Sequence, residues 1–291
     1  MAILLAADSR VIIQGITGSQ GAYHARLIKE YGTRIVAGVT PGRGGEEVHG
    51  IPVFDTVKEV REIAGHLDAS MILVPPRAVK DAAVEAIEND IPIIVIITEH
   101  VPVHDTMYLR ALARQRGVRL VGPNTIGIIS PGKSKLGIMA SFLYPPGHIG
   151  MMSRSGTLSH ETASNLMYRG GGLSTVVGIG GDPVVGTDFV DLLPLFAADP
   201  ETEAVIMIGE IGGNKEERAA EYLHSSSYPK PVFAYIAGQT APPGKQMGHA
   251  GAIIEGSLGK ADTKAAALAA AGVRVANSLE ELVEMVCSVF K

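Results

Sequence analysis

The chain has 291 residues, about twice the size of a typical domain, so two domains are expected. Its 46% hydrophobic residues exclude a disordered chain, and a net charge of -5 with scattered Lys and Arg argues against a nucleic-acid partner. The most apolar run, residues 91–98, is far below the ~20 residues that a membrane-spanning helix needs. The N-terminus lacks signal-peptide features and the single cysteine cannot form an internal disulfide, so we expect a cytoplasmic location and no membrane partner.

The first half of the chain alternates short β-branched runs with longer amphipathic segments, which is typical of a parallel sheet covered by helices. Its predicted strands are Val11–Ile13, Ile35–Val39, Met71–Val74, Ile93–Ile97 and Leu120–Val121. The turn residues Gly122-Pro123-Asn124 close this set. We therefore expect one domain over residues 1–124 and a second over residues 125–291.

The second half restarts the same alternation. Its predicted strands are Ile149–Ser153, Ser174–Ile179, Ala204–Gly209, Val232–Ala237 and Val273–Ala276, followed by a closing helix over Leu279–Phe290. The sequence therefore predicts an α/β protein with two doubly wound domains.

A glycine-rich turn follows the first strand. It reads Gly15-Ile16-Thr17-Gly18-Ser19-Gln20-Gly21 and precedes a helical pattern that starts near Tyr23. Glycines in such a turn let the amides of a helix N-terminus approach a phosphate. The spacing differs from G-x-G-x-x-G, so a structural turn without a ligand is an alternative.

Two further strand ends in this half carry polar residues. After the second strand, Arg43 stands in a loop where an NAD enzyme has a ribose-binding acid. A cation there suits a ligand with an extra phosphate, such as CoA or NADP, although a solvated surface arginine is the alternative. Residues Ile97-Thr98-Glu99 follow the fourth strand, at the edge where open α/β sheets bind ligands; a helix cap at Thr98 is the other interpretation.

Three features of the second half point to phosphoryl chemistry. Ser155-Gly156-Thr157 open a helix, so they form either an anion site of free amides or an ordinary N-cap. Glu210 ends a strand, where it could orient an imidazole. His249 lies between Gly248 and Ala250, which leave its ring accessible. Because neutral imidazole attacks phosphorus near pH 7, His249 is a candidate nucleophile, with a structural histidine as the alternative.

Taken in order, these segments resemble the α subunit of succinyl-CoA synthetase from Val11 to the last helix. The resemblance rests on the glycine-rich turn at 15–21 and on Ser153-Arg154-Ser155-Gly156-Thr157-Leu158, Gly178-Ile179-Gly180-Gly181-Asp182-Pro183, Gly209-Glu210-Ile211-Gly212-Gly213 and Gly248-His249-Ala250-Gly251-Ala252. It implies a CoA-binding Rossmann-like domain followed by a flavodoxin-like ligase domain. The implied enzyme is an acid–thiol ligase of the tricarboxylic acid cycle that works through a phosphohistidine and an acyl phosphate.

The resemblance also implies a partner and a set of site residues. The partner is an ATP-grasp β subunit, in an αβ or α2β2 assembly, that holds ATP or GTP with Mg²⁺, and we expect no metal site in this chain. By the same resemblance His249 is phosphorylated, Glu210 orients it, and Ser155, Gly156 and Thr157 bind the phosphate. The residues expected to bind coenzyme A are Thr17, Gly18, Ser19, Gln20, Arg43, Ile97, Thr98 and Glu99.

Departures from the family pattern gather near the expected carboxylate site. His160 stands where the family commonly has tyrosine, and Ile126 and residues 137–144 also differ. These parts look somewhat like ATP-citrate lyase and citryl-CoA synthetase, and residues 132–139 look like malate-CoA ligase. Extra donors such as His160 suit a more polar carboxylate. Succinate is the expected substrate, citrate and malate are alternatives, and His160→Tyr is expected to alter the preference.

Three other classes of protein share some of these features. An NAD-dependent dehydrogenase would have the ribose-binding acid and leaves His249 unexplained. A non-catalytic CoA-binding module would not need Glu210 and His249 together. A single-chain ADP-forming acyl-CoA synthetase carries its ATP-grasp part in the same chain, for which 291 residues leave no room.

Overall fold

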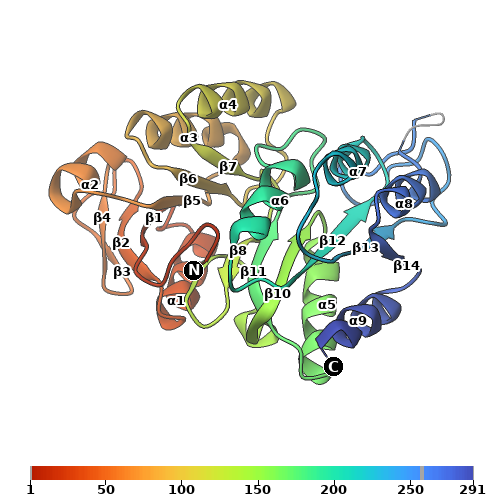
Figure 1. Cartoon of the computed structure of the whole chain (residues 1–291). Coiled ribbons are helices and arrows are strands. Elements are labelled where there is room, and N and C mark those ends of the chain that lie inside the picture. The colour runs from red at the N-terminus through yellow and green to blue at the C-terminus, as the bar shows by residue number, and fades with distance from the viewer. Residues whose placement is uncertain (1, 256–258, 291) are drawn as a thin grey trace.

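The computed structural model describes residues 2–255 and 259–290, which form two helix-covered sheets lying side by side (Figure 1). Within these residues the first sheet has the strand order β3-β4-β2-β1-β5-β6-β7 and the second has the order β14-β13-β12-β10-β11-β8-β9. The α/β architecture of two doubly wound units is thereby confirmed. No helix of the described residues is long and apolar enough to cross a membrane.

The first sheet is parallel apart from the β3–β4 hairpin. Its strands are β1 (Arg10–Gln14), β2 (Arg34–Val39), β3 (Glu47–Val48), β4 (Ile51–Phe54), β5 (Ala69–Ile72), β6 (Ile93–Ile96) and β7 (Arg119–Val121). The helices are α1 (Ser19–Glu30), α2 (Val57–Ala64), α3 (Val79–Glu88) and α4 (Val103–Gln115), with a 3-10 turn η1 (Pro76–Ala78). The order from β4 to β7 is that of a Rossmann fold, whose ligand crevice lies at the carboxyl ends of β1 and β5.

The second sheet is parallel from β14 to β11. Its strands are β8 (Gly127–Ser130), β9 (Ser134–Gly137), β10 (Pro146–Ser153), β11 (Leu173–Gly178), β12 (Ala204–Glu210), β13 (Val232–Ala237) and β14 (Arg274–Ala276). The helices are α5 (Gly156–Tyr168), α6 (Phe189–Ala198), α7 (Lys215–Ser225), α8 (Ala261–Ala270) and α9 (Leu279–Cys287), with 3-10 turns η2 (Ser141–Leu143) and η3 (Ser288–Phe290). The order β14-β13-β12-β10-β11 is flavodoxin-like, so the ligand crevice is expected between the ends of β10 and β12.

Helix α1 begins at Ser19, before the helical pattern near Tyr23 that the sequence suggests. The sequence pattern does not show this earlier start because the first turn of the helix is closely packed. A Cβ on Gly21 would lie 2.1 Å from the Gly15 carbonyl oxygen. Small residues are required there, and small residues carry no hydrophobic periodicity. The glycine-rich turn therefore includes the first turn of the helix itself.

The sequence analysis predicted neither of the two hairpins, β3–β4 and β8–β9, because their strands have only two to four residues. Strand β8 of the β8–β9 hairpin pairs antiparallel with β11, and the hairpin joins the two halves of the chain. Thr33 donates to the Lys135 carbonyl and accepts from the Lys135 amide, both at 2.8 Å, and Ser134 donates to the Leu5 carbonyl at 3.0 Å. The sheets divide between Val121 and Gly127, and the domain boundary at residue 124 stays a prediction.

Candidate active site

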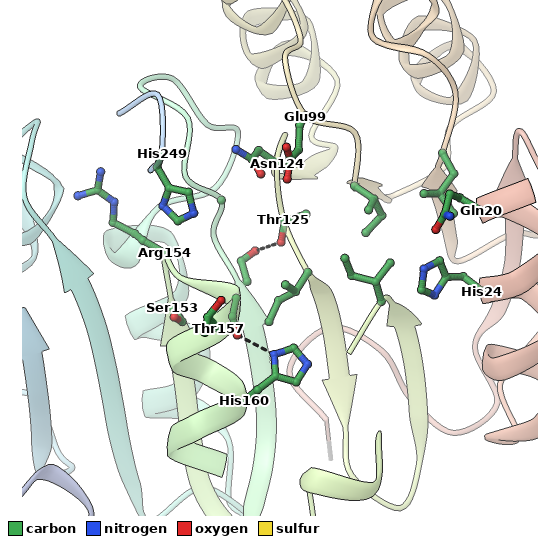
Figure 2. Close-up of a pocket in the computed structure, with 17 residues that line it drawn as sticks. Gln20, His24, Glu99, Asn124, Thr125, Ser153, Arg154, Thr157, His160 and His249 are labelled. Carbon is green, nitrogen blue, oxygen red and sulfur yellow. Dashed lines mark hydrogen bonds between the residues drawn. The ribbon is translucent and has the colours of Figure 1, made fainter. Parts of the chain in front are cut away.

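A cavity of about 440 Å³ lies between the two halves, at the carboxyl ends of β5, β6, β10 and β11 (Figure 2). The side chains or backbone that line it come from both halves: Gln20, His24, Leu73, Ile97, Glu99, Asn124, Thr125, Ile126, Ile138, Ser153, Arg154, Gly156, Thr157, His160, Gly178, Gly180 and His249. Several residues singled out in separate parts of the sequence therefore share one cavity. It coincides with the ligand crevice expected for the first half at the end of β5, and with the crevice expected for the second half at the end of β10.

His249 forms part of the cavity wall and contacts Glu210, which ends β12. Its Nδ1 lies 2.7 Å from Glu210 Oε2. An ionised carboxylate only accepts hydrogen bonds, so Nδ1 carries the proton and Nε2 is left as the nitrogen with a free lone pair. The ring packs directly on Gly181, where a Cβ would lie 2.3 Å from its Cγ atom. The geometry therefore fixes both the tautomer and the orientation of a half-buried imidazole.

The Glu210 hydrogen bond raises the pKa of His249 above its ordinary value, and burial opposes this rise only in part. A raised folded-state pKa means that the protonated ring stabilises the fold below the unfolded pKa and that this stability is lost as the pH rises through the folded pKa. The chemistry runs in the opposite direction, because only the neutral ring is a nucleophile. We therefore expect activity to rise as His249 deprotonates.

Replacing Glu210 with glutamine is expected to lower kcat about a hundredfold and to move the acid limb of the pH–rate profile to lower pH. The carboxylate that raises the pKa of His249 is then gone, and the ring is held less firmly. The measurement is kcat against pH for both proteins. Glu221→Gln, at an exposed position on α7, is the control; an unmoved acid limb in Glu210→Gln would contradict this account.

Arg154 is a residue of the site to which the sequence analysis gave no role. It directly follows β10, and its side chain is fully buried against Glu210 (3.2 Å) and Glu216 (2.8 Å). Lys264 joins the same cluster through Glu216 at 2.6 Å. A charged residue directly after a buried strand was the available signal. The cluster pairs Glu210 with Arg154. It also places the Arg154 cation near His249 (Figure 2).

The first turn of α5 forms another part of the cavity wall through Gly156 and Thr157. Ser155 is the N-cap, and its side chain accepts from the Leu158 amide at 3.3 Å. The ordinary N-cap interpretation is therefore correct for the Ser155 side chain. The Ser155 side chain bonds only one first-turn amide. The other first-turn amides have no helical partners and could donate hydrogen bonds to a bound anion.

The residues expected to bind CoA fall into two groups. Gln20, Ile97 and Glu99 line the cavity. The others are not part of its lining: Thr17, Gly18, Ser19, Arg43 and Thr98. Thr17 donates to the Thr40 hydroxyl at 3.2 Å and Thr98 to the Val74 carbonyl at 2.8 Å, while exposed Arg43 is paired with Glu46.

His160 lines the cavity (Figure 2), and both of its ring nitrogens are already engaged. Nδ1 donates to the Gly156 carbonyl at 2.7 Å, and Nε2 accepts from the Ala140 amide at 3.2 Å. The ring also packs edge-on against buried Tyr144, with ring centres 5.6 Å apart. In this structure His160 therefore has no spare donor for a carboxylate.

The peptide unit that joins Met139 to Ala140 is held from both sides. Lys135, itself buried, donates its Nζ to the Met139 carbonyl at 2.9 Å, and His160 accepts from the Ala140 amide. This clamp fixes the segment next to Ile138, which lines the cavity. Its effect is to tie that wall of the cavity to the first turn of α5.

The cavity lies between a Rossmann-like and a flavodoxin-like unit, and comparisons with known proteins define the class as a CoA ligase. Residues 6–100 match the CoA binding domain family, and residues 152–274 match the CoA-ligase family. The chain is 55% identical to a succinate–CoA ligase [ADP-forming] subunit alpha of Methanothermobacter thermautotrophicus, over 97% of this chain and 95% of the relative. A subunit alpha 2 from Archaeoglobus fulgidus is 53% identical over 99% of this chain and 100% of its own length. The chain therefore belongs to the succinate–CoA ligase α-subunit family.

Solved structures show the same fold. An ATP citrate lyase from Methanothrix soehngenii, solved with citrate and coenzyme A, has a TM-score of 0.89 at 23% identity and covers 99% of this chain. A dinucleotide forming acetyl-coenzyme A synthetase 1 from Ca. Korarchaeum cryptofilum has a TM-score of 0.76 at 21% identity and covers 95% of this chain. This chain spans only 51% and 59% of those two proteins. The family resemblance, the ligase class and the CoA-binding half expected from the sequence are confirmed.

Proposed function

We propose that the chain is the α subunit of an ADP-forming succinate–CoA ligase in which His249 carries the phosphoryl group. The contact that carries the proposal is the 2.7 Å hydrogen bond between His249 Nδ1 and Glu210, because it leaves Nε2 as the nucleophilic nitrogen. The names of relatives that are 52–55% identical supply the ligase class and the substrate.

The proposed reaction has three steps. His249 Nε2 attacks the terminal phosphorus of ATP, and the bond between that phosphorus and the departing ADP oxygen breaks. A succinate carboxylate then takes the phosphoryl group, which forms an acyl phosphate and restores the imidazole. The CoA thiol loses its proton and attacks the acyl carbon, so that a thioester forms and inorganic phosphate leaves. Glu210 holds the ring throughout, and the amides that open α5 stabilise the phosphate.

The nucleotide with its Mg²⁺ is proposed to lie on a separate ATP-grasp β subunit. The relatives are named as alpha subunits, which supports a partner, and as ADP-forming, which supports ATP over GTP. In the described part of this chain, no group of three His, Cys, Asp or Glu side chains is arranged to hold a metal ion. An αβ or α2β2 assembly and a cytoplasmic location remain predictions.

The proposal is tested by phosphorylating the complex of this chain and its partner with ATP labelled in the γ-phosphate. The label is expected on this chain and is then expected to leave when CoA and succinate are added together. Malate and citrate are added in parallel, because the departures around His160 make them the alternative substrates. No label on this chain beside an active partner would overturn the ligase proposal in favour of a non-catalytic CoA-binding module.

Replacing His160 with leucine is expected to raise the KM of the carboxylate about tenfold, because the clamp on the Met139–Ala140 peptide is then released. The rate of His249 phosphorylation should not change, because the clamp does not touch that ring. His148→Leu, at an exposed histidine, is the control. His160→Tyr should change the relative kcat/KM for succinate, malate and citrate. Equal KM values in the His160→Leu and control proteins would contradict a positioning role.

A further inference from the structure

A second cavity, of about 300 Å³, has three arginines in its lining. It lies between α4, the start of β7 and the segment that leads into α6. Its charged lining is Arg110, Arg114, Arg119 and Asp191. Three guanidinium groups against one carboxylate give this wall a formal charge of +2. It shares no lining residue with the His249 cavity.

The arginines of this cavity are poorly neutralised by the chain. Within the described residues, none of the three lies within ion-pair distance of a carboxylate, and Arg119 reaches only the Asp191 carbonyl, at 3.5 Å. The Nε atom of Arg110 is shielded from water and has no hydrogen-bond partner there. The nearby Asp188 carboxylate is already paired with Arg218 at 2.9 Å. Burial, and then the charge of neighbouring arginines, lower the pKa of Arg110 below its ordinary value.

The cavity has fixed walls, because the two halves of the chain meet there at close range. The Gly186 amide donates to the Gly122 carbonyl at 2.8 Å, and the Thr187 hydroxyl donates to the Leu120 carbonyl at 2.7 Å. A Cβ on Gly186 would lie 2.3 Å from the Leu120 carbonyl oxygen. The site is therefore formed before any ligand arrives, which lowers the cost of binding.

We infer that this cavity binds a small phosphate-bearing anion. Guanidinium groups match the oxygen geometry of phosphate and bind it through charge-assisted hydrogen bonds, and several arginines around one space favour a multiply charged ligand. The volume is at the lower end of the range for small-molecule sites, roughly 300–1,000 Å³. The inference does not depend on the proposed ligase reaction, because the two cavities are separate.

The test is equilibrium dialysis of the full chain against radiolabelled inorganic phosphate at low ionic strength. Arg110→Gln and Arg114→Gln are each expected to lower the affinity for one bound phosphate at least tenfold. Arg114 is exposed, so its variant should fold normally. The matched control is Arg116→Gln, which removes the same charge from the end of α4 outside the cavity lining.

Counting bound phosphates keeps the result separate from any phosphate held near His249, since only one bound ion is expected to be lost. Identical binding in all three variants and the wild type, or no phosphate bound at millimolar concentration, would overturn the inference. The bound phosphate group could belong to a nucleotide or be free inorganic phosphate, and addition of ADP distinguishes the two. Displacement of the phosphate assigns the cavity to a nucleotide phosphate, and retention assigns it to the free anion.

Discussion

Replacing His249 with asparagine is expected to remove the phosphorylated form of the chain and to lower turnover at least about ten-thousandfold. Asparagine retains a polar side chain in the loop but has no nitrogen that can attack phosphorus. The fold should survive, because the His249 side chain is only half-buried and its one hydrogen bond within the described residues is the bond to Glu210. The measurement combines labelling by γ-labelled ATP with steady-state kinetics of the complete complex.

The control for this experiment is His100→Asn, which changes an exposed histidine outside the cavity lining. That protein should become phosphorylated at the wild-type rate. If His249→Asn retained label or substantial turnover, the phosphoryl acceptor would have to be another residue. Unchanged urea denaturation of His249→Asn would show that the loss is chemical.

Replacing Arg154 with methionine is expected to destabilise the protein by about 3–5 kcal/mol, because it leaves buried carboxylates without their main counter-charge. Burial alone would raise the pKa of Glu216, but Arg154 and Lys264 outweigh burial and hold that pKa below its ordinary value. A depressed folded-state pKa gives stability above the unfolded pKa, which is lost as the pH falls through the folded pKa. The variant should therefore lose stability mainly at neutral pH and less in acid.

Urea denaturation of the chain at several pH values measures this effect. Arg169→Met is the matched control, because exposed Arg169 also pairs with two glutamates, Glu280 at 3.7 Å and Glu284 at 3.0 Å. Exposed pairs of this kind contribute about 0–1 kcal/mol. Equal losses in the two variants would mean that the buried cluster has no special role in stability.

The sequence predicted the fold well where strands are buried on both faces. Segments such as Val232–Ala237 read as continuous apolar runs, and they form the strands that those runs indicate. The β8–β9 hairpin was missed because its short strands, Gly127–Ser130 and Ser134–Gly137, each include a glycine and a serine, and the second also includes a lysine. Nothing in their local pattern distinguishes them from a loop.

The candidate site was predicted in part. The sequence predicted the contact between His249 and Glu210. His249 was singled out because its small neighbours leave the ring accessible, and Glu210 because it ends a strand. The fixed tautomer of His160 could not be predicted, since it depends on the Ala140 amide and the Gly156 carbonyl, which only the folded chain brings together. The roles of these residues in the reaction stay predictions.

The β8–β9 hairpin has a thermodynamic consequence. It belongs to the second sheet, yet Thr33 and Leu5 of the first half hold it, and one apolar core continues from Ile28 through Leu136 into the second half. Unfolding either half would expose apolar surface of the other and break the hydrogen bonds between them. We therefore expect the two halves to melt together as one cooperative unit, so that neither half populates a folded state alone.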